Sequence, residues 1–186
     1  MKFMGYIRPD KVGGIVNSFK YKGLTVRVVM DWAMGHVIDN GFKGQIMGSS
    51  RNNNNAIKDA MTNSWQSAND GTKYPKYTVQ SDYDYQYRNH MRWDNQIGSS
   101  ESGSTNNSLY FSKGDYLAFR EVSLSYMLPS TWVRKIRLSG VEVFAGAYNI
   151  GYIKKYDGMF PEIYTGVDYG VYPRPRQYNM GVKINF

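Results

Sequence analysis

The sequence ends with Tyr178-Asn179-Met180-Gly181-Val182-Lys183-Ile184-Asn185-Phe186, in which apolar and polar side chains alternate strictly. Successive side chains of a β-strand point to opposite faces, so this stretch predicts a strand that is apolar on one side and polar on the other. Such a strand suits a half-buried sheet of a soluble protein, and it also suits a transmembrane β-barrel with its apolar row toward lipid. A strand that ends on a terminal aromatic residue favours the barrel.

Two strands with a tight turn between them are predicted near the other end of the sequence. The segment 14–21 has period-two alternation, and 24–34 alternates over eleven residues. Lys22-Gly23 separates them, and glycine supplies the positive φ that a two-residue hairpin turn requires. The two segments therefore form a hairpin.

A third strand, over about 115–128, changes phase in its middle. Leu117 and Phe119 share one parity, whereas the apolar residues from Val122 onward share the other, and the polar pair Arg120-Glu121 lies at the change. One extra residue restores a common apolar face on both sides of such a break, so we predict a β-bulge there. A fourth strand over about 138–153 has apolar residues of both parities, which leaves its apolar face undecided.

The connections between these five strands alternate between short and long. Residues 22–23 and 129–137 are short, and 35–114 and 154–174 are long. In the short 129–137 we expect one turn of helix capped by Ser130, and in the first long connection a helix over 56–66 with Asn55 as its N-cap. Membrane barrels have short periplasmic turns and long outer loops, so the alternation agrees with a periplasmic C-terminus.

The composition argues against several classes of protein. The chain of 186 residues has no Cys, which excludes disulfides and thiolate sites, and no apolar run approaches the ~20 residues of a membrane helix. A formal net charge of +8 raises nucleic-acid binding, but the basic residues are scattered and form no recognition helix, so we expect no nucleic-acid partner. The first ten residues lack the apolar core of a signal peptide.

Four blocks of sequence, in this order, resemble the C-terminal end of SusC/RagA-type TonB-dependent outer-membrane transporters. The resemblance covers nearly the whole chain and is weakest at 36–110. The matching residues are Pro9-Asp10, Gly13-Gly14, Asn17, Phe19, Tyr21-Lys22-Gly23, Asp31-Trp32 and Gly35; Trp65 and Lys73-Tyr74-Pro75; Tyr116 through Pro129 (YLAFREVSLSYMLP) and Trp132; and Asn149, Lys155-Tyr156, Gly158, Pro161-Glu162 and Tyr172-Pro173-Arg174-Pro175-Arg176 before the final strand.

This resemblance implies an all-β fold: residues 1–186 would be the C-terminal portion of an antiparallel transmembrane β-barrel domain of about 22 strands. About five strands would be present, with long extracellular loops and short periplasmic turns, and without the plug domain or signal peptide. The implied function is part of a nutrient importer for oligosaccharides or peptides in the outer membrane of a Gram-negative bacterium. The implied partners are a SusD-like surface lipoprotein, the TonB complex through the missing N-terminal part, the barrel-assembly machinery through the final strand, and outer-membrane lipid and lipopolysaccharide.

Candidate binding residues lie in the tyrosine-rich segment 82–88. Tyr83, Tyr85 and Tyr87 would contact substrate or the surface lipoprotein, since surface loops often carry recognition. The alternative is a barrel-mouth loop that packs on itself. Trp32, Tyr126, Trp132 and Tyr148 could stack on a sugar in the lumen. We interpret such aromatic residues instead as girdles at the membrane interfaces.

No catalytic residue, metal site or cofactor is expected. His36 and His90 are far apart in sequence, each without a second His or a Cys nearby, and the chain has no recognisable nucleophile motif or glycine-rich phosphate loop. An enzyme is therefore not predicted. Two other functions stay open: a soluble β-sandwich that binds carbohydrate or protein, and a small structural or adhesin-type outer-membrane barrel.

Overall fold

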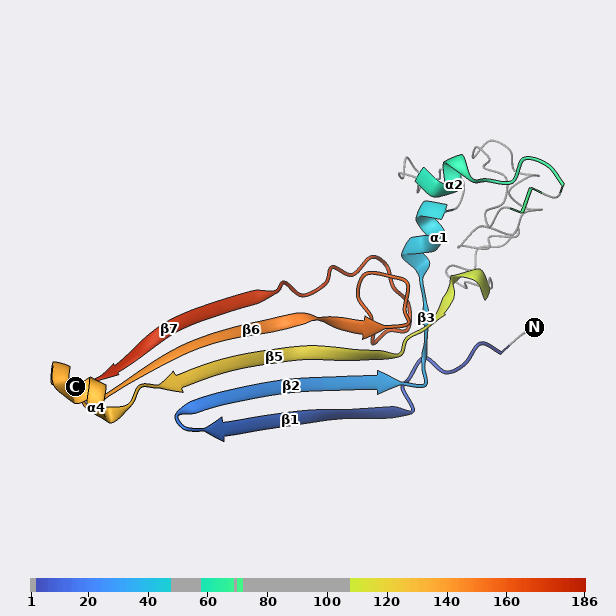
Figure 1. Cartoon of the computed structure of the whole chain (residues 1–186). Coiled ribbons are helices and arrows are strands. Elements are labelled where there is room, and N and C mark those ends of the chain that lie inside the picture. The colour runs from blue at the N-terminus through green and yellow to red at the C-terminus, as the bar shows by residue number, and fades with distance from the viewer. Residues whose placement is uncertain (1–2, 48–57, 69, 72–107) are drawn as a thin grey trace. The chain divides into compact units, whose positions relative to one another are not determined.

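A computed structural model describes residues 3–47, 58–68, 70–71 and 108–186 (Figure 1). The chain divides into two compact units, which are described separately. The sheet unit comprises 9–36, 114–155 and 172–186, and the loop unit comprises 1–8, 37–113 and 156–171.

The sheet unit is a five-stranded antiparallel sheet in the order β1-β2-β5-β6-β7 (Figure 1). Its strands are β1 (Lys11–Tyr21), β2 (Leu24–Met34), β5 (Tyr116–Met127), β6 (Gly140–Lys154) and β7 (Gln177–Asn185). Each predicted strand is present, and each strand pairs with the next strand of the sheet unit along the chain. The all-β prediction is confirmed for this unit.

The two short connections lie at the same end of the sheet. Lys22 and Gly23 have φ values of 44° and 85°, the two positive values that a type I′ hairpin turn needs. The second connection contains α4 (Ser130–Val133) and η2 (Arg134–Ile136). The backbone N–H of Met127 donates to the carbonyl of Gly23 at 2.8 Å, which joins the two turns.

The predicted cap of the short helix is wrong. Pro129 occupies the N-cap position, with φ −56°, and no side chain makes a capping hydrogen bond. Ser130 is the first helical residue, one position too late for its hydroxyl to act as the N-cap acceptor. Proline starts this turn by fixing φ near the helical value instead.

The predicted bulge is confirmed at Arg120. Val29 of β2 pairs with Glu121, and the next residue, Met30, pairs with Phe119, so Arg120 is the extra residue. Because of this insertion, the apolar residues before and after it face the same side of the sheet. On that side, β2 and β5 pair Leu24 with Tyr126, Val26 with Leu124, Val28 with Val122, Met30 with Phe119 and Trp32 with Leu117.

The pairing also settles which residues of β6 share that side. Residues directly opposite one another in an antiparallel pair lie on one face. The register therefore assigns Val141, Val143, Ala145 and Ala147 of β6, and Tyr178, Met180, Val182 and Ile184 of β7, to the side of Leu124 and Tyr126. We call this side the apolar face, and the opposite side, with Asp31, Arg27, Ser123, Tyr148 and Lys183, the polar face.

The loop unit contains short elements that alternation did not predict. β3 (Val37–Asp39) pairs with β4 (Phe111–Lys113). Helix α1 (Gly41–Met47) follows β3 along the chain, and η1 (Ser108–Tyr110) directly precedes β4. The expected helix over 56–66 is present as α2 (Lys58–Thr62), while its predicted cap, Asn55, lies outside the described residues. In the described part of the chain, no helix has the length and hydropathy to cross a bilayer.

Candidate functional site

The candidate site lies in the loop unit, where three segments far apart in sequence meet. β3 runs into Asn40, whose side-chain oxygen accepts the backbone N–H of Lys43 at 2.9 Å. This is the bond of a helix N-cap, and it explains why α1 begins at Gly41. Asp39 forms a parallel bridge with Val167, which brings the segment 156–171 beside β3.

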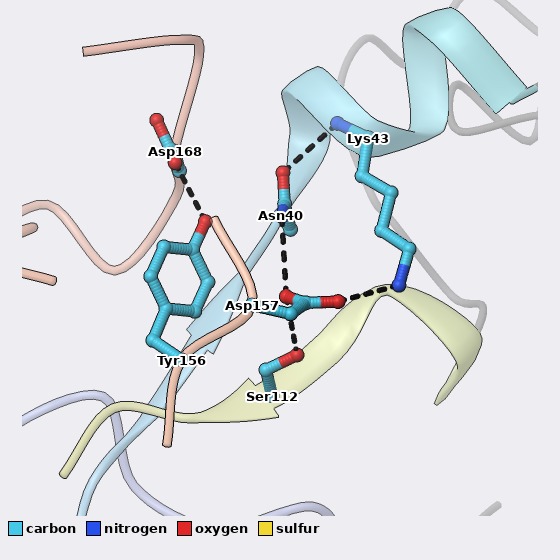
Figure 2. Close-up of polar contacts among 6 residues, drawn as sticks. All are labelled: Asn40, Lys43, Ser112, Tyr156, Asp157 and Asp168. Atoms are coloured by element: carbon cyan, nitrogen blue, oxygen red, sulfur yellow. Dashed lines mark hydrogen bonds and ion pairs between the residues drawn. The ribbon is translucent and has the colours of Figure 1, made fainter. Parts of the chain in front are cut away.

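Asp157 is the centre of a polar cluster (Figure 2). Lys43 Nζ lies 2.5 Å from one carboxylate oxygen, and the other oxygen accepts from Ser112 Oγ at 2.9 Å and from Asn40 Nδ2 at 3.4 Å. Burial acts to raise the pKa of Asp157, but the hydrogen bonds from Lys43 and Ser112 outweigh it and the pKa is lowered. The carboxylate is therefore ionised and connects α1 to β4.

A second carboxylate, Asp168, is buried beside the first cluster (Figure 2). One of its oxygens accepts from the hydroxyl of Tyr156 at 2.6 Å, and the other accepts from the backbone N–H groups of Gly170 and Val171 at 2.8 and 3.0 Å. Burial and this hydrogen bond both raise the pKa of Tyr156. The phenol therefore stays protonated and serves as a donor, not as a base.

Asp39 is a third carboxylate of the loop unit, and its side chain is buried. Its exposed fraction is 3%, and burial raises its pKa to about 6. Tyr110 is fully buried, and burial, with the nearby charge of Asp39, raises its pKa to about 12. Burial therefore keeps the proton on Asp39 to a higher pH than on a free carboxyl group.

An open cleft of about 290 Å³ adjoins the cluster. Its lining combines apolar and hydrogen-bonding side chains: Asn40, Phe42, Lys43, Ile46, Asp157, Gly158, Met159, Asp168 and Gly170. This mixture suits contact with a small polar group that has an apolar side, such as a sugar ring or an amino-acid side chain. Among the described residues, no group of three or more His, Cys, Asp or Glu side chains is placed to hold a metal ion.

The polar face of the sheet carries a second cluster, which the bulge creates. Arg120 contacts both carboxylate oxygens of Asp31, one of them at 2.7 Å, and also donates to the hydroxyl of Tyr152 at 3.3 Å. Glu121, the next residue, accepts from Ser123 Oγ at 2.9 Å and lies 3.4 Å from Arg27. Because the bulge turns both Arg120 and Glu121 to one side, the two ion pairs lie on the same face.

The residues predicted from the sequence are not those of the two carboxylate clusters. Tyr83, Tyr85 and Tyr87 lie outside the described residues, so they stay predictions. Trp32 and Tyr126 lie on the apolar face, and Tyr148 lies on the polar face. The clusters around Asp157 and Asp168 were not predicted, although Asn40-Gly41 and Asp168-Tyr169-Gly170 are cap and turn signals that sequence reasoning can use.

Comparison with known proteins gives relatives of one kind. No family model matches the chain. It is 25% identical over 197 residues to TonB-dependent receptor P3 of Formosa agariphila, an alignment that covers 100% of the chain and 17% of that receptor. It is 26% identical over 91 residues to TonB-dependent receptor SusC of Bacteroides thetaiotaomicron, which covers 48% of the chain and 9% of that receptor.

The fold is also that of solved transporters. The RagAB peptide importer in its closed-closed state matches 100% of the chain with a TM-score of 0.73 and 21% identity, and the chain covers 18% of it. A further structure of the RagAB peptide transporter matches 97% of the chain with a TM-score of 0.71 and 20% identity, and the chain covers 17% of it. The chain is thus similar in sequence to TonB-dependent receptors and in fold to the RagAB transporter, and it spans less than a fifth of the length of each.

Proposed function

We propose that this chain forms part of the barrel wall of a TonB-dependent nutrient importer in the outer membrane of a Gram-negative bacterium. The observation that supports it best is the register of the five strands. The bulge at Arg120 and the pairing of β6 and β7 together bring every strand into one phase, with one apolar and one polar face. A wall between lipid and a water-filled lumen needs this two-sidedness.

The apolar face would contact lipid. Its edge strand β7 leaves Tyr178, Met180 and Val182 more than half exposed, which is costly in water and favourable in hydrocarbon. On the other face, the ion pairs of Arg120 with Asp31 and of Arg27 with Glu121 would line the lumen. Charged pairs are excluded from the lipid side but are tolerated in a wet interior.

The connections give the proposed orientation. The two long connections leave the sheet at the end opposite to the short turns, and they carry the loop unit. In barrels of this kind the long loops are extracellular, so the loop unit and its cleft would lie outside the cell. There the cleft around Asp157 would contribute to contacts with substrate or with a surface lipoprotein.

The cargo and partners are inferred from the relatives. RagAB is a peptide importer, which supports peptides as the cargo class; oligosaccharides are the other class that we infer. We further infer a SusD-like surface lipoprotein as partner and TonB as energy source for the complete transporter. Because the relatives are receptors and transporters, we infer no enzymatic role.

The face assignment is testable because the chain has no Cys of its own. Single cysteines would be placed at neighbouring positions, Ser123→Cys on the polar face and Leu124→Cys on the apolar face. In outer membranes from cells that produce the complete transporter, a small water-soluble thiol reagent should label Ser123→Cys at least about tenfold faster, because a thiol in hydrocarbon is shielded from the reagent.

A matched pair on the next strand serves as the control. Gly146 and Ala145 of β6 lie opposite Ser123 and Leu124, so Gly146→Cys should label quickly and Ala145→Cys slowly. In urea all four variants should react at one rate. Equal labelling of both parities in the membrane would rule out the proposed wall.

A further inference from the structure

The short turn between β5 and β6 has features that the barrel wall does not require. Within it, α4 and η2 fold around Val133, which is buried, and Arg137 ends the turn in the left-handed conformation with φ 59°. Trp132 and Ile136, four residues apart, remain 62% and 65% exposed. Two large apolar side chains are therefore held at the surface by a well-defined turn.

The same turn carries a concentrated positive charge. Arg134, Lys135 and Arg137 lie within four residues, and no acidic residue occurs in 129–138. In the part of the chain that the structure describes, none of the three forms an ion pair or a side-chain hydrogen bond. The turn thus combines an exposed indole with three unpaired cations.

Neighbouring elements extend this surface. The turn at Lys22-Gly23 is joined to it through Met127, and the N–H of Ser139 donates to the carbonyl of Asn185 at 2.9 Å, which holds the C-terminal end of β7 beside it. Lys22 adds another cation at this end of the sheet. The one acidic residue early in β6, Glu142, lies directly opposite Lys183.

We propose that this turn, residues 129–138, binds the headgroups of anionic phospholipids and anchors the sheet at the membrane surface. The inference rests on the proposed function, which places the short turns beside a phospholipid leaflet. Charge complementarity selects the ligand, because basic clusters next to membrane-spanning segments attract anionic headgroups. Trp132 would occupy the interface, where its ring is in the apolar boundary and its N–H is in the wet headgroup layer.

Vesicle flotation of the full chain tests the proposal. Binding would be compared between phosphatidylcholine vesicles and vesicles that also contain phosphatidylglycerol. The triple variant Arg134→Gln, Lys135→Gln, Arg137→Gln should lose about ten- to a hundredfold of the preference for anionic vesicles, since each basic residue contributes a factor of about five.

The control variant removes the same number of charges elsewhere. Arg8→Gln, Lys11→Gln and Lys113→Gln neutralise three exposed basic residues outside the turn, so both triple variants lower the net charge of +8 by three. This control should keep the preference. An equal loss in both variants would overturn the proposal, because net charge alone would then govern binding. No preference for anionic vesicles in the parent chain would overturn it as well, because binding would then not depend on charge.

A second measurement follows Trp132 itself. Fluorescence quenching by brominated phosphatidylglycerol should exceed quenching by brominated phosphatidylcholine, and Trp132→Phe should remove the difference. A difference that persists in Trp132→Phe contradicts the anchor. The cysteine labelling of Ser123→Cys and Leu124→Cys in outer membranes is scored in parallel, and equal labelling there counts against the barrel wall, not against the headgroup site.

Discussion

At the scale of single residues, two carboxylates of the loop unit respond to their surroundings in opposite ways. Asp39 is buried, which raises its pKa to about 6. Asp157 is also partly buried, yet Lys43 and Ser112 donate to it and its pKa is lowered. One carboxyl group therefore favours the proton in the folded state, and the other favours the ionised form.

Asp39 should make the loop unit less stable as the pH rises. Its folded pKa is above the unfolded value of 3.8, so its stabilising contribution is complete below about pH 4 and is lost as the pH rises through about 6. A shift of this size corresponds to about 3 kcal/mol. Asp39→Asn should remove this pH dependence, measured as the free energy of local opening of β3 by hydrogen exchange corrected for intrinsic rates.

Asp157→Asn is the matched control for this experiment. The lowered pKa of Asp157 means that its contribution is present above the unfolded pKa and is lost as the pH falls through the folded value. The variant should therefore weaken the loop unit at neutral pH and have less effect in acid. A pH dependence that is unchanged in Asp39→Asn would show that Asp39 is not the responsible group.

Gly114 should not tolerate a methyl group. A Cβ at this position would overlap the imidazole ring of His36, which is 95% buried. Overpacking of this kind costs about 1–3 kcal/mol, so Gly114→Ala should lower the unfolding midpoint of the sheet unit. Adding His36→Ala should recover most of the loss in a double-mutant cycle, and simple additivity would contradict the steric explanation.

At the scale of elements, the bulge at Arg120 sets the phase of the second half of β5. Deleting Arg120 should turn residues 121–127 to the opposite faces, since a one-residue slip exchanges the two sides of a strand. The labelling of Ser123→Cys and Leu124→Cys should then be reversed, or the protein should fail to assemble in the membrane.

Arg120→Ala tests whether the inserted residue or the side-chain contacts of Arg120 set the register of β5. This variant keeps the extra residue and loses the contacts with Asp31 and Tyr152, so the labelling pattern should be that of the parent. If Arg120→Ala inverted the pattern as well, the ion pair and not the insertion would define the register.

The elements that sequence reasoning predicted are those whose periodicity is long. β2 alternates over eleven residues and β7 over nine, which leaves one phase possible, and even the bulge was visible because apolar residues changed parity across Arg120-Glu121. β3 and β4 have three residues each, too few for a period, and they pair across more than seventy residues of sequence. The site around Asp157 was missed for the same reason, because its partners Lys43 and Ser112 belong to distant short segments.

β6 shows where pattern alone fails. Phe144, Tyr148 and Tyr152 give it apolar or aromatic residues on both sides, so hydropathy does not select a face. Only pairing with β5 and β7 resolves it. Tyr152 lies on the polar face, where its hydroxyl accepts a hydrogen bond from Arg120 and its ring packs on Tyr116. The local sequence around Tyr152 does not predict these contacts.

At the scale of the whole molecule, the sheet ends in two edge strands, β1 and β7. Each edge has unpaired backbone groups, and in hydrocarbon every such group costs several kcal/mol. The smallest membrane barrels need about eight strands to close, and this sheet has five.

The 186-residue chain alone should therefore give no heat-modifiable, protease-resistant barrel. Gel mobility with and without boiling, after refolding in detergent, measures this directly. The positive control is a transporter of the same group with its full complement of strands. A compact, boiling-sensitive species from the chain alone would mean that the edges pair with each other or with a second copy.

The loop unit interrupts the sheet unit only where the strands turn back at one end, through 37–113 and 156–171. Insertions, deletions and replacements in these segments should therefore leave the pairing of β1, β2, β5, β6 and β7 unchanged. In the proposed transporter, the loop unit can therefore change among relatives while the five-stranded wall stays the same. An engineer can graft a foreign epitope or binding loop at the same positions.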